Sequence, residues 1–111
     1  MARYIIYFNQ QWVGDHSAEW FGSRGPLARQ VVSEMEDAGV LVFAGGLEEE
    51  IEHAIGISES GETGESITKN GEFIGGLTII EVSSEEEAKR WGSKVAVTCG
   101  WPQEVRKFKE N

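Results

Sequence analysis

The sequence predicts an α+β domain with the ferredoxin-like order βαββαβ and a β-hairpin inserted before the third sheet strand. Three short runs rich in β-branched and aromatic residues, at 3–8, 40–43 and 76–82, are typical of buried strands. Stretches with an apolar face at helical spacing lie between the first two runs and after the third. Turn-rich residues at 53–69 predict the hairpin. The length of 111 residues is that of one domain, so we take residues 1–111 as a single domain.

The formal net charge is −9, from 19 acidic and 10 basic residues. Phosphate groups repel such a chain, so we expect no nucleic-acid partner and no binding to anionic membranes. Cys99 is the only cysteine, which excludes an internal disulfide and fits a reducing, cytoplasmic location. We find no targeting pattern, and the apolar run 4–8 is too short to span a membrane. Two histidines without spaced cysteines predict no metal site, and no cofactor-binding motif is present.

The first strand and the segment after it differ sharply in composition. Residues 3–8 are apolar or aromatic on both faces, which predicts a strand covered on two sides. Residues 9–25 form a long polar connection, and a connection of this length in a small domain is usually a functional loop. Within it, Ser17 is suited to cap a single helical turn.

The first helix is expected to begin at Pro26, which suits a first helical turn. An apolar stripe follows at helical spacing, formed by Leu27, Val31, Met35 and Ala38. Gly39 is a good residue for the position after a helix end, where φ is often positive. The strand at 40–43 then ends at Gly45 and Gly46, where a ligand has room.

Alternation at 53–59 predicts a hairpin strand with His53 on its apolar face, a turn at 60–64 and a short return strand at 66–69. After the strand at 76–82, Ser84 and Glu87 have the spacing of a capping box. The second helix is expected to bury Ala88, Trp91 and Val95. A loop at 98–102 and a final strand at 103–109 complete the chain.

Three segments, 38–47, 74–91 and 104–106, resemble the YCII-related or DGPF-type proteins. The resemblance implies a dimeric α+β barrel, a fold also used by small-ring isomerases and dehydrochlorinases, and in some relatives a His–Asp pair proposed to be catalytic. The region where that His would lie reads Arg-Gly-Pro at 24–26. The family's Asp-Gly-Pro-Phe motif reads Asn-Gly-Glu-Phe at 70–73. These departures favour a domain that binds a ligand without the family's catalysis.

A ligand cleft is predicted between one sheet face and the loop 9–25. The residues expected to line or border it are Tyr7, Asp15, His16, Trp20, Arg24 and His53. His16, beside Asp15, and His53 are the candidate acid–base groups. Trp20 can stack on a planar ligand, and Arg24 can hold a carboxylate at a helix start. Each also has a purely structural interpretation, as a solvated histidine, a packed tryptophan or a surface ion pair.

Three functions stay open at this point. The first is a small-molecule-binding YCII-related domain. The second is a lyase or isomerase that moves a proton through His16 or His53, and the third is a non-catalytic interaction module linked to transcriptional regulation. We also expect a homodimer, because two helices can cover only one face of a sheet whose strands are apolar on both faces.

Overall fold

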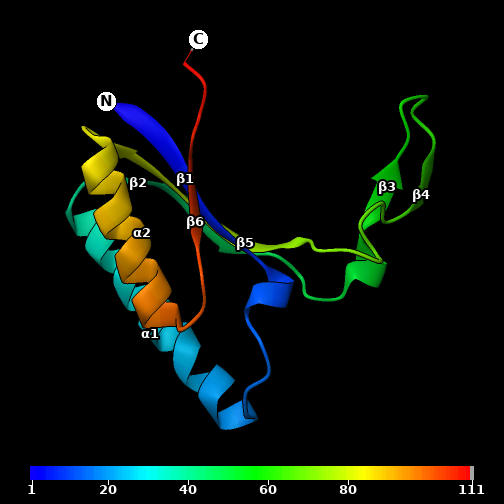
Figure 1. Cartoon of the computed structure of the whole chain (residues 1–111), viewed down its shortest axis with the longest axis horizontal. Helices are drawn as coiled ribbons and strands as arrows, with labels where there is room; N and C mark the ends of the chain where they lie inside the picture. The colour runs from blue at the N-terminus through cyan, green and yellow to red at the C-terminus, as the bar shows by residue number, and fades with distance from the viewer. Residues whose placement is uncertain (111) are drawn as a thin grey trace.

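The computed structural model describes residues 1–110 and contains a four-stranded antiparallel sheet with both α-helices packed on one face (Figure 1). The sheet strands are β1 (Ala2–Asn9), β2 (Leu41–Gly46), β5 (Ile74–Val82) and β6 (Glu104–Lys107), and the helices are α1 (Ala18–Asp37) and α2 (Glu85–Cys99). The strand order is β2-β5-β1-β6, so β5 lies between β1 and β2. This α+β arrangement is compatible with the predicted ferredoxin-like fold.

Alternate side chains of the central strands form the core. Ile6 on β1 lies opposite Thr78 on β5, and Tyr4 lies opposite Ile80. All four side chains point to the helix side of the sheet and are buried. Met35 of α1 packs into the same cluster and has no exposed surface. The helices therefore cover one face, which we call the inner face.

Helix α1 begins at Ala18, eight residues before the predicted start, and Pro26 lies inside it. The segment 9–25 is therefore not a long loop. It contains the short 3-10 helix η1 (Gln10–Trp12), a brief link and the first turns of α1. The Ser17 hydroxyl accepts the Trp20 backbone N–H at 3.1 Å, so the predicted cap initiates the whole helix. A proline inside a helix removes one hydrogen bond and its ring crowds the carbonyl four residues earlier, and this cap together with aromatic packing of the first turns outweighs that cost.

The C-terminal end of α1 and the N-terminal end of α2 follow the predicted local signals. Gly39 has φ +72, its N–H donates to the carbonyl of Glu36, and the N–H of Val40 donates to Met35. This is a Schellman closure. The buried stripe differs in part from the prediction, because Ala38 is exposed at the cap and Leu27 is only half-buried, whereas Ala28 packs on the core.

At the start of α2, the Ser84 hydroxyl accepts the Glu87 N–H at 3.1 Å. The Glu87 carboxylate reaches back to the N–H and hydroxyl of Ser83, so the capping box closes one residue earlier than in the standard form. Helix α2 continues to Cys99, which shortens the predicted loop, and Gly92 joins Ala88 and Val95 as a buried residue, whereas Trp91 is half-buried.

Between β2 and β5 the chain leaves the sheet as a projecting segment, residues 47–73, which we call the arm (Figure 1). It contains η2 (Ile51–His53) and the hairpin strands β3 (Ile55–Ile57) and β4 (Thr63–Glu65). The prediction was wrong in two details. His53 lies in η2 rather than on a strand, and the return strand is β4 instead of 66–69. The turn closes early because Gly61, with φ +86, allows its N–H to reach the carbonyl of Ser58.

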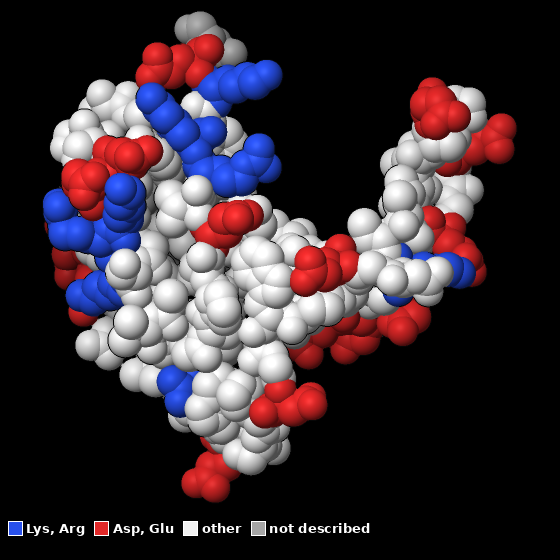
Figure 2. Space-filling model, viewed as in Figure 1, with Lys and Arg blue, Asp and Glu red and all other residues white. Residues whose placement is uncertain are grey.

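The arm gives the molecule an extended shape, with dimensions of 44 × 41 × 18 Å. The radius of gyration is 15.5 Å, against about 13 Å for a compact chain of this length. The accessible surface is 7531 Å², whereas a compact protein of this mass exposes about 6,100 Å². The arm and the sheet border an open hollow (Figure 2).

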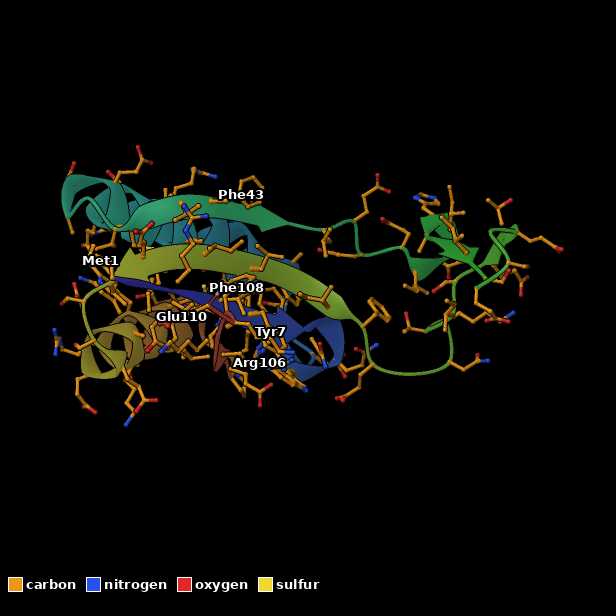
Figure 3. The ribbon with its side chains drawn as sticks, turned by 90° about the horizontal axis from the view of Figure 1, so that it is seen from above. Met1, Tyr7, Phe43, Arg106, Phe108 and Glu110 are labelled. Carbon is orange, nitrogen blue, oxygen red and sulfur yellow. The ribbon has the colours of Figure 1, made fainter. Side chains whose placement is uncertain are left out.

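The second face of the sheet, which we call the outer face, is covered by no helix of the described chain. Several apolar or aromatic side chains lie along it in Figure 3, from Phe43 on β2 to Phe108 just after β6. Phe43 is 56% exposed, and Ile79, its partner on β5, is half-buried. Of the described helices, none combines the length and the apolar character that crossing a membrane requires.

Candidate functional site

A cleft of about 1100 Å³ lies between α1 and the inner face of the sheet. This is the upper end of the size range of small-molecule sites. Its walls are mainly apolar, with Ile6 and Phe8 contributed by β1 and Ala28, Val31 and Val32 by α1. The predicted cleft therefore exists as a space beside the sheet, but a helix rather than a loop forms its second wall.

Glycines shape the sheet side of this cleft. Gly45 and Gly46 at the end of β2 line it, as the sequence predicted. A Cβ at Gly75 would lie 2.6 Å from the Phe8 ring, and one at Gly76 would lie 2.9 Å from it. These two residues therefore have to be glycine for Phe8 to lie against the sheet. The Phe8 ring in turn contacts Trp101 with a centroid separation of 5.1 Å.

Three N–H donors in this region have no hydrogen-bond partner and no exposed surface. They are Arg24 Nε, Trp101 Nε1 and Gln103 Nε2, and all three residues line the cleft. A buried donor without a partner costs about 1–3 kcal/mol, so native proteins rarely keep one. All three donors belong to residues that line one cleft, but none of the donor atoms has exposed surface, so their side chains have to turn toward the cleft before they can bind an acceptor-rich ligand group.

Aromatic packing holds Arg24 in position. Its guanidinium lies 4.1 Å from the centroid of the Trp20 ring, and Nη1 donates to the backbone carbonyl of Thr98 at 3.2 Å. Trp20 contacts Trp101 with a centroid separation of 5.9 Å. Because Trp20 and Arg24 are one helical turn apart on α1, the early start of this helix brings both to the end of α2.

His16 lies at the rim, outside the cleft lining. Its ring stacks on Trp20 at 3.6 Å between centroids, and Nε2 donates to the backbone carbonyl of Val13 at 2.9 Å. The imidazole is therefore oriented by Val13, whereas the sequence suggested orientation by Asp15, which is exposed. Val13 and Gly14 line the cleft, so Asp15 and His16, which follow them in the chain, lie at its border.

Tyr7 and His53 lie away from this cleft. Tyr7 points to the outer face and donates to the Glu104 carboxylate, which raises the pKa of the phenol (Figure 3). His53 lies in the arm, where Nδ1 is 2.8 Å from a carboxylate oxygen of Glu48. This contact raises the pKa of His53. The sequence analysis had placed His53 on the apolar face of a strand, where burial would lower the pKa, whereas here His53 is exposed beside an anion, which raises it.

The groups that can react within the cleft are few. Cys99 lines it, and burial raises the pKa of this thiol, which keeps it protonated and weakly nucleophilic. The charged residues of the lining are Arg24, Arg29, Glu36 and Glu49. Elsewhere, potential ligand atoms of Glu48, Glu50 and His53 lie within 4.8 Å of one another in the arm. All three are exposed, and such acidic groups are common without an ion, so we assign no metal site to them.

Sequence reasoning missed Trp101 and Gln103. They are about 80 residues from Arg24 in the chain, and only the turn at Gly100, with φ +91, returns them to the first turns of α1. The one available signal was the pair of rigid residues Trp101 and Pro102 directly after a helix-ending glycine.

No protein-family model matches the chain, and no curated protein matches it at a significant level.

Proposed function

We propose that this protein binds a small, largely apolar molecule that carries a carboxylate, in the cleft between α1 and the inner face of the sheet. The observation that carries the proposal is the set of three buried donors without partners, at Arg24, Trp101 and Gln103. A carboxylate has two oxygens that accept several N–H groups, and hydrogen bonds to a charged acceptor are worth about 1.5–3 kcal/mol.

The remaining walls suit the rest of such a ligand. Phe8 and Trp101 offer aromatic surface, and Ala28, Val31 and Val32 offer aliphatic surface. Burial of apolar area in a cleft of this kind supplies most of the binding free energy, while a few polar groups orient the ligand. Small aromatic and keto acids fit both requirements.

Binding is favoured over catalysis by the position of the titratable groups. Neither candidate acid–base residue, His16 or His53, is among the described residues that line the cleft, and the Cys99 thiol is kept protonated by burial. The alternative function, proton transfer in a lyase or isomerase, would require His16 to reach the ligand from the rim. In that case His16→Ala would abolish turnover while leaving binding intact.

The second part of the proposal concerns family and assembly. We propose that the chain is a cytoplasmic, YCII-related domain and that it forms a homodimer through the outer face. The exposed Phe43, Val42 and Phe108 support a dimer, because an uncovered apolar sheet face is unusual for a monomer in water. Sedimentation equilibrium tests this part, and a monomer mass at all concentrations would contradict it.

Thermal-shift and calorimetric binding measurements with a panel of small aromatic and keto acids test the ligand proposal. Each acid is paired with its methyl ester, which has the same apolar body but no charge. We expect the wild-type protein to bind a matching acid at least about tenfold more tightly than its ester, a difference of about 1.4 kcal/mol. The double variant Trp101→Phe/Gln103→Leu, which removes two of the donors, should lose this preference.

His53→Ala is the matched control, because this residue is exposed in the arm and should leave both affinities unchanged. The melting temperature of each free variant reports whether the fold is intact. Equal binding of acid and ester by the wild-type protein, or binding of no member of the panel, would contradict the proposal.

A further inference from the structure

The arm exposes apolar side chains that none of residues 1–110 covers. Ile55 is 71% exposed, Ile57 59% and Ile67 80%. A two-stranded hairpin is marginally stable in water without a third layer. Exposed isoleucines on such a hairpin therefore indicate a surface that is covered by another molecule.

The base of the arm is fixed to the sheet. The N–H of Gln10 donates to the carbonyl of Phe73 at 2.8 Å, and the Phe73 N–H donates to the side chain of Gln11. Trp12 Nε1 donates to the carboxylate of Glu72 at 3.0 Å. The arm is thus held at one end of the outer face, beside the hollow that Figure 2 shows.

Charge is divided between the two ends of the outer face. The arm, residues 47–73, has eight glutamates and one lysine, and so carries most of the net charge of the chain. The opposite end of the sheet carries a cluster that we call the basic end, formed by Arg3, Arg106, Lys107 and Lys109, all of them exposed. Arg3 is paired with Glu81 at 3.2 Å and Lys107 with Glu110 at 3.5 Å, so Arg106 and Lys109 are the cations of this cluster without an ion pair among the described residues. Strand register fixes this separation, because Asn9 pairs with Ile74 next to the arm whereas Arg3 pairs with Glu81.

We infer that the arm is a clasp that closes on the basic end of a second copy of this chain when two outer faces pack about a two-fold axis. Of the two ways to pack the faces, one places both acidic arms at the same end, where they repel each other. In the other, the stacked copies point in opposite directions, so that each arm lies beside the basic end of the partner. The clasp extends the homodimer proposed above.

The surface area is consistent with a second copy. The chain exposes about 1,400 Å² more than a compact protein of its mass. Two copies that remove this excess would bury about 2,800 Å² in total, within the range of obligate homodimers. The contact would also cover the isoleucines of the arm.

Charge reversal provides a test in which two variants that each weaken the dimer should pair with each other. Glu59 and Glu62 lie at the hairpin turn, and Arg106 and Lys109 lie at the basic end, and none of the four belongs to an ion pair in the described chain. The arm variant is Glu59→Lys/Glu62→Lys, and the basic-end variant is Arg106→Glu/Lys109→Glu. Each variant alone has two repulsive contacts per dimer, whereas one copy of each has two attractive contacts.

We expect each variant alone to dimerise at least about tenfold more weakly than the wild-type protein at low salt, and an equimolar mixture to recover wild-type affinity as a heterodimer. Sedimentation velocity and native mass spectrometry measure both. Arg90→Glu, a reversal on the exposed surface of α2, is the matched control and should not weaken the dimer. Circular dichroism confirms that each variant is folded.

Three outcomes would overturn the clasp. Variants that dimerise like the wild-type protein would show that the arm does not contribute to the outer-face homodimer. A mixture that fails to recover would exclude pairing between the arm and the basic end. A monomeric wild-type protein would contradict both the clasp and the homodimer, but not ligand binding in the cleft, which the acid and ester pairs test separately.

Discussion

The same residue type has opposite environments in the two regions of this protein. Ile6 and Ile80 are buried between the sheet and the helices, whereas Ile57 and Ile67 are mostly exposed in the arm. The sheet has a second layer to bury its side chains against, and the hairpin has none. Hydrophobic burial therefore stabilises the body of the molecule, while the arm is held by turn hydrogen bonds and by its fixed base.

The two environments indicate where a partner binds. Apolar residues of the body are explained by the fold. Those of the arm and the outer face have no such explanation within the chain, and this is why they indicate a partner. The comparison can be tested by making equivalent changes in both regions.

The largest difference is expected for truncation of an isoleucine. Ile80→Ala leaves a void in the fully buried core and should lower the free energy of unfolding by about 2–5 kcal/mol. Ile57→Ala should change it by less than about 0.5 kcal/mol in dilute, monomeric protein. Urea unfolding at low protein concentration measures both, and similar losses for the two variants would refute the contrast.

The second-largest difference is expected when a buried glycine in each region is replaced by alanine. In Gly92→Ala the new Cβ would lie 2.7 Å from Val105 Cγ2 between α2 and β6, and we expect a loss of about 1–3 kcal/mol in global stability. In Gly56→Ala the Cβ would lie 2.1 Å from the backbone oxygen of Glu65, which should open the β3–β4 pair alone.

Hydrogen exchange resolves these two glycine variants. For Gly56→Ala we expect faster exchange only within 55–65, with an unchanged melting temperature. Cooperative loss of the whole fold would show that the arm and the body are one unfolding unit.

The smallest effect concerns pH and is local to the arm. Glu48 raises the pKa of His53, so the charged contact stabilises the arm fully below the ordinary histidine pKa of about 6.5 and is lost as pH rises through the higher folded value. NMR titration should therefore give a higher pKa for His53 in the wild-type protein than in Glu48→Gln. An unchanged His53 pKa in Glu48→Gln would contradict this role of the Glu48 contact.

The local signals in the sequence predicted local structure well. Ser17, Gly39 and Ser84 act at helix ends as their residue types indicate, because caps depend on neighbours within a few residues. Pro26 misled the prediction of the start of α1. Its cost is one missing hydrogen bond and the crowding of a carbonyl, and the contacts of Trp20 with Trp101 and of Arg24 with Thr98 decided the outcome.

The candidate site was predictable only in part. Arg24 lines the cleft and Trp20 packs against Arg24, so the sequence placed these two residues at the cleft, while their role in binding a ligand stays a prediction. Tyr7 was placed wrongly because alternation along a strand separates two faces without saying which one the helices cover. His53 was placed wrongly because a three-residue strand leaves too little pattern to fix where it begins.

The α+β class, the two helices, the main sheet strands, the inserted hairpin and the caps could be predicted from the sequence, since they depend on spacing and on residue types close together in the chain. The remaining features arose from long-range packing. It placed Trp101, Gln103 and Arg24 along one cleft, left one sheet face without a helix over it in the described chain and set an acidic arm at the end opposite a basic cluster. These features depend on contacts between residues tens of positions apart, which no local pattern encodes.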